Sequence, residues 1–151
     1  MNNTNDKPLI RMAFACPDGK SMINSHFGDS TAFTICEGDG HRFSIIKMIP
    51  NGNKFALHGE KEKAINIIDA LKSENIQIVV ARNYGPNIEH IITRLVPVKT
   101  HSNDLKSAIR DVAAVWNELS VVALSEFSIR GRISFDAGKS SETIEVEITG
   151  D

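Results

Sequence analysis

Cysteine is scarce in this chain, and its scarcity narrows the kinds of protein that the sequence can encode. Cys16 and Cys36 are the only two cysteines among 151 residues, and they form no Cys-x-x-Cys motif. The sequence therefore excludes a structural zinc site built on cysteine pairs and a disulfide framework. Long apolar runs are also lacking: none approaches the roughly 20 residues that cross a bilayer. Residues 1–7 are polar and do not resemble a secretory signal, so we expect a cytoplasmic protein without a membrane partner.

An excess of charge of one sign is lacking as well. The chain has 17 Lys and Arg against 19 Asp and Glu, which gives a formal net charge of −2. Proteins that bind nucleic acid usually present a strongly basic face, so we expect no nucleic-acid partner. The apolar content of 41% is ordinary for a globular protein, and a chain of this length can bury the core of one domain.

The hydrophobic pattern predicts strands that alternate with helices. Continuous apolar runs at residues 10–15 and 76–81 are typical of strands that are covered on both faces. Residues 32–37 and 43–49 flank a turn-forming segment and predict a hairpin, and residues 96–100 predict a further strand. Helical spacing of apolar residues predicts three helices. The first includes Ile68 and Leu71, and the second begins at Pro86. The third is capped by Ser102 or Asn103, and its inner face consists of Leu105, Ile109, Val112 and Trp116.

Because strand–helix–strand crossovers produce parallel neighbours, strands 10–15, 76–81 and 96–100 are expected to run parallel. The fold class is therefore α/β, with a three-layer α/β/α architecture. We expect a disordered tail at residues 1–8, one domain at residues 9–119 and a β extension at residues 120–151.

The extension has its own pattern. Apolar residues alternate with polar ones on both sides of the turn-forming residues 136–141, which predicts a C-terminal β-hairpin. An uncapped hairpin edge invites pairing, so the extension is a candidate surface for a homodimer.

Three polar segments are predicted to meet at one edge of this sheet. Ligands of open α/β sheets bind beyond the carboxyl ends of the parallel strands, where residues 16–28, 83–85 and 101–103 would gather. The last two segments also begin helices, whose free N–H groups favour an anion. Such a site suits an anionic ligand with soft, metal-like character better than it suits a bare hard cation.

Ser25-His26-Phe27-Gly28 is the most informative motif in this region. Imidazole is the commonest protein ligand for transition metals, so His26 is a candidate metal ligand, with Cys16 as a candidate second ligand. In the alternative interpretation Phe27 fills the core, Gly28 supplies a positive φ and His26 only caps a backbone group. Cys16 is equally interpretable as a structural thiol at a strand end, and a nucleophilic role lacks an obvious carboxylate to orient the histidine.

The residues also resemble a known family. The run at 10–15, Asp18-Gly19-Lys20, Ser25-His26-Phe27-Gly28 and Phe33-Thr34-Ile35 resemble the nitrogenase iron–molybdenum cofactor biosynthesis proteins, which include NifX, NafY and the C-terminal domain of NifB. Residues 78–85 are similar to a second landmark of that family, a buried strand that ends in a glycine before a helix. The resemblance covers residues 9–119.

This resemblance implies a ribonuclease H-like fold of five mixed strands with three helices. It also implies a non-enzymatic carrier that receives an iron–sulfur or iron–molybdenum cluster, or its precursor, from a donor protein and passes it to an acceptor. The cofactor-liganding histidine of the family corresponds to His26, whereas Cys16 and His101 are supported only by the argument from the sheet edge. The candidate cofactor-binding residues are His26, Phe27, Gly28, Cys16, Asn83, Tyr84, Gly85 and His101, of which His26 and Cys16 are the candidate metal ligands.

Other functions remain open at this point. A regulatory or protein-interaction domain of the same fold, without bound metal, is the main alternative. A nuclease is disfavoured, because two-metal phosphoryl chemistry needs carboxylates on strand ends, and neither residues 10–15 nor residues 76–81 include Asp or Glu. Asn83-Tyr84 replaces the simpler apolar pair expected before Gly85, which allows for a relative with a different ligand.

Overall fold

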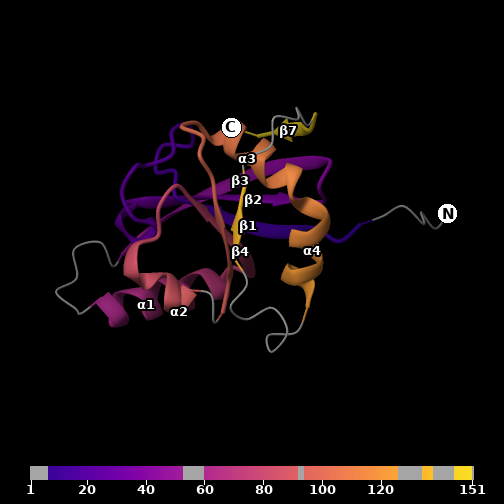
Figure 1. Ribbon diagram of the computed structural model, residues 1–151. Coiled ribbons are helices and arrows are strands. Elements are labelled where there is room, and N and C mark those ends of the chain that lie inside the picture. Colours follow the sequence, from indigo (N-terminus) through magenta and orange to yellow (C-terminus); the bar gives the residue numbers. More distant parts are fainter. Residues whose placement is uncertain (1–6, 53–59, 92–93, 126–133, 138–144, 151) are drawn as a thin grey trace.

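A mixed β-sheet forms the centre of the protein (Figure 1). The computed structural model describes residues 7–52, 60–91, 94–125, 134–137 and 145–150. The strands are β1 (Ile10–Phe14), β2 (Ala32–Gly38), β3 (Arg42–Pro50), β4 (Ile76–Ala81), β5 (Val96–Lys99), β6 (Phe135–Asp136) and β7 (Glu147–Thr149). They form one seven-stranded sheet in the order β6-β5-β4-β1-β2-β3-β7. As predicted, β1, β4 and β5 are parallel, and β2 runs antiparallel to β1 and β3.

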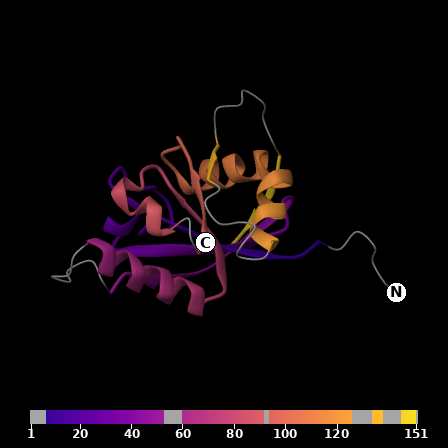
Figure 2. The same ribbon diagram turned by 60° about the horizontal axis from the view of Figure 1, so that its bottom comes forward.

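Helices cover both faces of this sheet and complete the predicted three layers. Helices α1 (Glu60–Ser73) and α2 (Ile88–Ile91) contact each other on one face, and α3 (Leu105–Ala114) and α4 (Trp116–Leu124) cover the other. In Figure 2, α1 lies below the sheet strands and α3 above them. No helix in the described part of the chain is long and apolar enough to cross a membrane.

The side chains of β1 show how the sequence builds two cores. Successive residues of a strand point to opposite faces. Met12 and Phe14 pack with α3 and α4, whereas Ala13 packs with α1, and all three are fully buried. A continuous apolar run is therefore required here, since burying a large apolar side chain contributes about 1.5–3 kcal/mol on either face.

The third predicted helix is confirmed, with two corrections. Leu105, Ile109, Val112 and Trp116 are buried as expected. The helix is interrupted at Val115, so that Trp116 begins α4 rather than continuing α3. The N-cap is Asp104, not Ser102 or Asn103, and its carboxylate accepts a hydrogen bond of 2.9 Å from the backbone N–H of Ser107.

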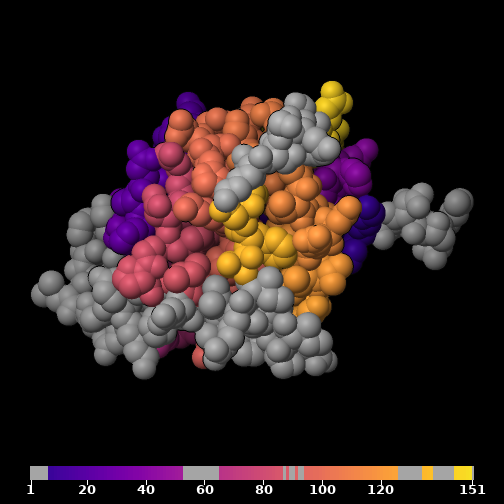
Figure 3. All heavy atoms as spheres, viewed as in Figure 1, coloured from indigo at the N-terminus to yellow at the C-terminus, as the bar shows by residue number. Residues whose placement is uncertain are grey.

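The predicted C-terminal hairpin is wrong. β6 pairs in parallel with β5, and β7 pairs in parallel with β3, so the two strands lie at opposite edges of the sheet. The alternating pattern correctly indicated strands, but it could not show which strands they pair with. Each of the two strands pairs with an edge strand that is distant in the sequence. Figure 3 shows the yellow-orange residues of β6 beside the orange helix α4. Residues 1–6 of the predicted tail, and Ile133 and Ile144 of the predicted hairpin, lie outside the described residues.

Candidate functional site

The three predicted segments do meet at the carboxyl edge of the parallel strands. The loop after β1 crosses this edge and is held by backbone hydrogen bonds to each neighbour in turn. The N–H of Met22 donates to the carbonyl of Asn103 at 2.8 Å, and that of Phe27 donates to the carbonyl of Asn83, also at 2.8 Å. The N–H of Ile23 returns to the carbonyl of Ala15 at the end of β1. These backbone hydrogen bonds thus determine the position of the loop on the edge of the sheet.

His26 lies on top of this edge, with its side chain exposed. It forms an isolated β-bridge with Asn83, and its ring lies against Gly85. Gly85 has a φ of +65°, and a Cβ atom at that position would be 2.4 Å from Nδ1 of His26. Glycine is therefore required by both the backbone conformation and the close approach of the ring. The ring atoms that approach this position most closely are Nδ1, Cε1 and Cγ.

These observations test the structural interpretation of the motif, part by part. His26 occupies the N-cap position of a 3-10 helix at Phe27–Asp29, but its side chain makes no capping hydrogen bond. Gly28 is buried and is not among the glycines with positive φ, so the expectation that it supplies such a conformation is wrong. Phe27 does fill the core, as that interpretation proposed.

Phe27 and Tyr84 anchor the site from below. Their rings stack with centroids 5.8 Å apart, and Phe27 also stacks on Phe33 at 4.7 Å. The Tyr84 hydroxyl lies 2.9 Å from the carbonyl oxygen of Val79 and 2.7 Å from that of Val98. Burial, as the main cause, raises the pKa of Tyr84 well above its ordinary value. Both aromatic residues of the predicted site therefore support the loops and are not exposed to a ligand.

Asn24, Arg82 and Asn83 form a hydrogen-bonded cluster at the surface of this edge. The Asn83 amide donates to the carbonyl oxygen of Asn24 at 2.5 Å, and the Arg82 guanidinium donates to the Asn24 side chain. The cluster holds the half-buried cationic side chain of Arg82 at the edge where His26 also lies. Asn24 was not predicted, because an asparagine in a polar loop carries no pattern that identifies its partners.

Cys16 is not brought together with His26. The thiol is buried in the core beneath α3 and α4, whereas Phe27, next to His26, belongs to the core beneath α1. Its sulfur lies 3.8 Å from a carboxylate oxygen of Asp18. Burial, as the main cause, raises the pKa of Cys16 to about 11, so the thiol is protonated near neutral pH. Burial in the other core, away from His26, argues against Cys16 as a second ligand beside this histidine.

His101, in contrast, is exposed at the expected edge. It follows β5 just as Asn83 follows β4, with Ala81 and Lys99 paired in register. Its Nε2 atom lies 2.6 Å from a carboxylate oxygen of Asp136 in β6. The predicted extension therefore reaches the site, through a residue that the sequence did not indicate.

A family comparison adds to this geometry. The model of the family described as dinitrogenase iron-molybdenum cofactor matches residues 9–115. The chain belongs to this family. No curated protein matches the chain. The matched range includes His26 and Gly85, and it ends before α4, so Asp136 lies outside it. Membership relates the chain to the binding or biosynthesis of the nitrogenase cofactor.

One prediction about the carboxyl edge of the sheet is wrong. The start of α3 was expected to offer free N–H groups to an anion, but the N–H of Leu105 donates to the carbonyl of Lys20 at 2.8 Å. The side chain of Asp104 caps the next turn, and hydrogen bonds from Ser107, as the main cause, lower the pKa of its carboxyl group. A negative charge already occupies this helix end. Nowhere among residues described by the structure do three or more His, Cys, Asp or Glu side chains gather in a metal-binding group.

Proposed function

We propose that the protein is a non-enzymatic carrier that binds an iron–sulfur or iron–molybdenum cluster, or a precursor of one, and hands it on. The observation that carries this proposal is the exposed imidazole of His26, held against Gly85 at the carboxyl edge of the sheet. The strand order β3-β2-β1-β4-β5 within the sheet supports the ribonuclease H-like arrangement that the resemblance implies.

The donor set suits a preformed cluster as cargo better than a free metal ion. A free ion needs several protein ligands, as in the closed four-ligand sites of zinc. A cluster brings most of its own ligands, so one imidazole is enough to attach it. Attachment through a single nitrogen also leaves the cargo easy to release to an acceptor protein. The cationic Arg82, which is bonded to Asn24 at the same edge of the sheet, complements an anionic cargo.

His101 is the better candidate for a second contact. Histidines that bind metals commonly use one ring nitrogen for the metal and donate the other N–H to a carboxylate, which orients the ring. The pair of His101 and Asp136 has this arrangement. We include His101 in the proposed site on this ground and leave Cys16 out.

The test is cluster loading under anaerobic conditions. Purified apo-protein is mixed with isolated iron–molybdenum cofactor, and molybdenum that co-elutes with the protein is measured after gel filtration. His26→Ala should lose most of the uptake. His41→Ala is the matched control, since His41 is also exposed but lies in the turn between β2 and β3.

Equal uptake by wild type and His26→Ala would remove His26 from the mechanism. No uptake by wild type, with this cofactor or with a reconstituted iron–sulfur cluster, would favour the alternative, a regulatory or interaction domain without metal. We also propose that the protein has no catalytic role, and the lack of Asp and Glu in β1 and β4 disfavours a two-metal nuclease in particular.

A further inference from the structure

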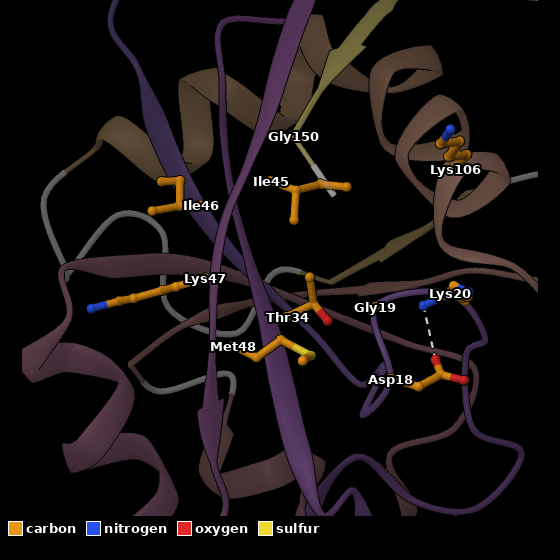
Figure 4. A pocket seen from close by; sticks show the side chains of 10 residues that line it. All are labelled: Asp18, Gly19, Lys20, Thr34, Ile45, Ile46, Lys47, Met48, Lys106 and Gly150. Carbon is orange, nitrogen blue, oxygen red and sulfur yellow. Dashed lines mark hydrogen bonds between the residues drawn. The ribbon is translucent and has the colours of Figure 1, made fainter.

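A cavity of about 540 Å³ lies between the β2–β3 hairpin and the loop after β1. Its lining comes from four parts of the chain: the loop, the two strands, the first turn of α3 and the C-terminal end after β7 (Figure 4). It lies on the α3 side of the sheet, over the core that contains Cys16 rather than the core that contains Phe27. The cavity is thus separate from the site at His26.

A β-bulge shapes the apolar wall. In the pairing of β2 with β3, Cys36 is opposite Ile45 and Ile35 is opposite Lys47, so Ile46 is the extra residue. The bulge restores Met48 to the same face as Ile45, although the two are three positions apart. Figure 4 shows both side chains pointing into the cavity, with Ile46 and Lys47 turned away. Met48 is 50% exposed, so this wall is open to a ligand.

The opposite wall is charged. Asp18 lines the cavity, and hydrogen bonds from the N–H groups of Ser21 and Lys20 lower the pKa of its carboxyl group. Lys20 and Lys106 line the same side, and within the described part of the chain no side-chain hydrogen bond or ion pair holds either ammonium group. Lys47 does not contribute its charge, because its Nζ atom is paired with Glu74 at 2.6 Å. Two free lysines and one aspartate give this wall a net charge of 2 − 1 = +1.

We propose that this cavity binds a small amphipathic carboxylate, with its apolar body on Ile45 and Met48 and its anionic group between Lys20 and Lys106. The volume lies within the range of about 300–1,000 Å³ that is typical of small-molecule sites. A single negative charge matches the net charge of the wall, whereas Asp18 would repel a multiply charged phosphate. The ligand would need no metal, so this site does not depend on the proposed cluster-carrier function.

The test uses octanoate as the probe, with octanol and octylammonium as uncharged and cationic analogues of the same length. Binding to the full-length protein is followed by chemical-shift changes of backbone amides. We expect octanoate to shift residues of β3 near Met48 and to bind more tightly than octanol, and we expect octylammonium to bind more weakly than either. Two exposed charge contacts predict that Lys20→Gln with Lys106→Gln weakens octanoate binding by about 3–10-fold.

Two controls make the result specific. Lys99→Gln removes an exposed lysine of β5, far from β3 in the strand order, and should leave octanoate binding unchanged. His26→Ala should also bind octanoate normally, so that failure of the carrier proposal and failure of this one are separable. Equal binding of octanoate and octylammonium, unchanged binding by the double lysine variant, or shifts that map away from β3 would overturn the proposal.

Discussion

Gly85→Ala tests whether the close approach of His26 to the backbone matters for function. A residue with a Cβ atom in the left-handed conformation costs about 1–2 kcal/mol, and Gly85 has a φ of +65°. The new Cβ would also be 2.4 Å from Nδ1 of His26. The imidazole is the exposed end of a flexible side chain, so we expect the ring to move and the backbone to stay.

The expected result is a small loss of stability with a large loss of binding. For a chain of this size, a loss of 1–2 kcal/mol lowers Tm by roughly 2–8 °C. Cluster uptake should fall toward the level of His26→Ala, although the histidine is still present. Circular dichroism gives Tm, and molybdenum co-elution gives uptake.

Gly19→Ala is the matched control for backbone strain. Gly19 has a φ of +74°, and a Cβ atom there would come no closer than 3.9 Å to a neighbour, the sulfur of Met48. It should lower Tm by a similar amount and leave cluster uptake intact. In a His26→Ala background, Gly85→Ala should have no further effect on uptake. Full uptake by Gly85→Ala alone would refute the idea that a fixed imidazole attaches the cargo.

Three further predictions concern the core, the thiol and the C-terminal extension. Gly40 has a φ of +102°, and a Cβ atom there would be 2.3 Å from the buried Trp116 ring. Because left-handed backbone strain adds to overpacking, Gly40→Ala should lower the free energy of unfolding, measured by urea denaturation, by roughly 2–5 kcal/mol. Cys16 should react with a thiol reagent at pH 7.5 only after unfolding. Because burial raises the pKa of Cys16 from its ordinary value of 9.0 to about 11 in the folded protein, the contribution of this thiol to stability should be lost as pH rises from 9 to 11. Asp136→Asn should weaken cluster uptake by about 2–10-fold through a less ordered His101, while changing stability by less than about 1 kcal/mol because the pair is exposed.

These three predictions have direct controls. Gly52→Ala places a Cβ atom in open space and should change stability little. Cys16→Ala should reduce the fall in stability between pH 9 and 11, and an unchanged pH profile would contradict the assignment. Glu147→Gln alters the exposed ion pair with Arg42 at the other edge of the sheet and should leave cluster uptake unchanged. Equal losses from Asp136→Asn and Glu147→Gln would show that His101 has no special role.

The central sheet and the location of the site were predictable because both depend on backbone topology. The apolar run of β4 lies between two segments with helical spacing, and strand–helix–strand crossovers produce parallel strands. The carboxyl ends of parallel strands lie at the same edge of the sheet. His26, Asn83 and His101 were placed at that edge without knowledge of any side-chain contact, and the structure places them there.

The rest depended on contacts that no local pattern contains. Cys16 lies two residues after β1, yet side chains alternate between faces, and its thiol enters the core away from His26. Asp104 could cap α3 or leave it open to a ligand, and only the fold decides that it caps. The partners of β6 and β7 are strands distant in sequence, so an alternating pattern was mistaken for a hairpin.

The C-terminal extension contributes to both proposed sites, and this allows one last experiment to separate them. Gly150 lines the cavity and has a φ of +87°, and a Cβ atom there would lie 2.4 Å from the backbone oxygen of Ile45. Gly150→Ala should push the end of β7 away from β3 and open the cavity. Losing on the order of 1 kcal/mol of apolar contact weakens octanoate binding about 3–10-fold.

Cluster uptake should be unaffected by Gly150→Ala, because β7 and His101 are at opposite edges of the sheet. Asp136→Asn should show the reverse, with weaker uptake and normal octanoate binding. If either variant impaired both properties equally, the two sites would be coupled through the extension, and their proposed independence would be wrong. If each impaired only one, the extension would serve each site through a different edge strand.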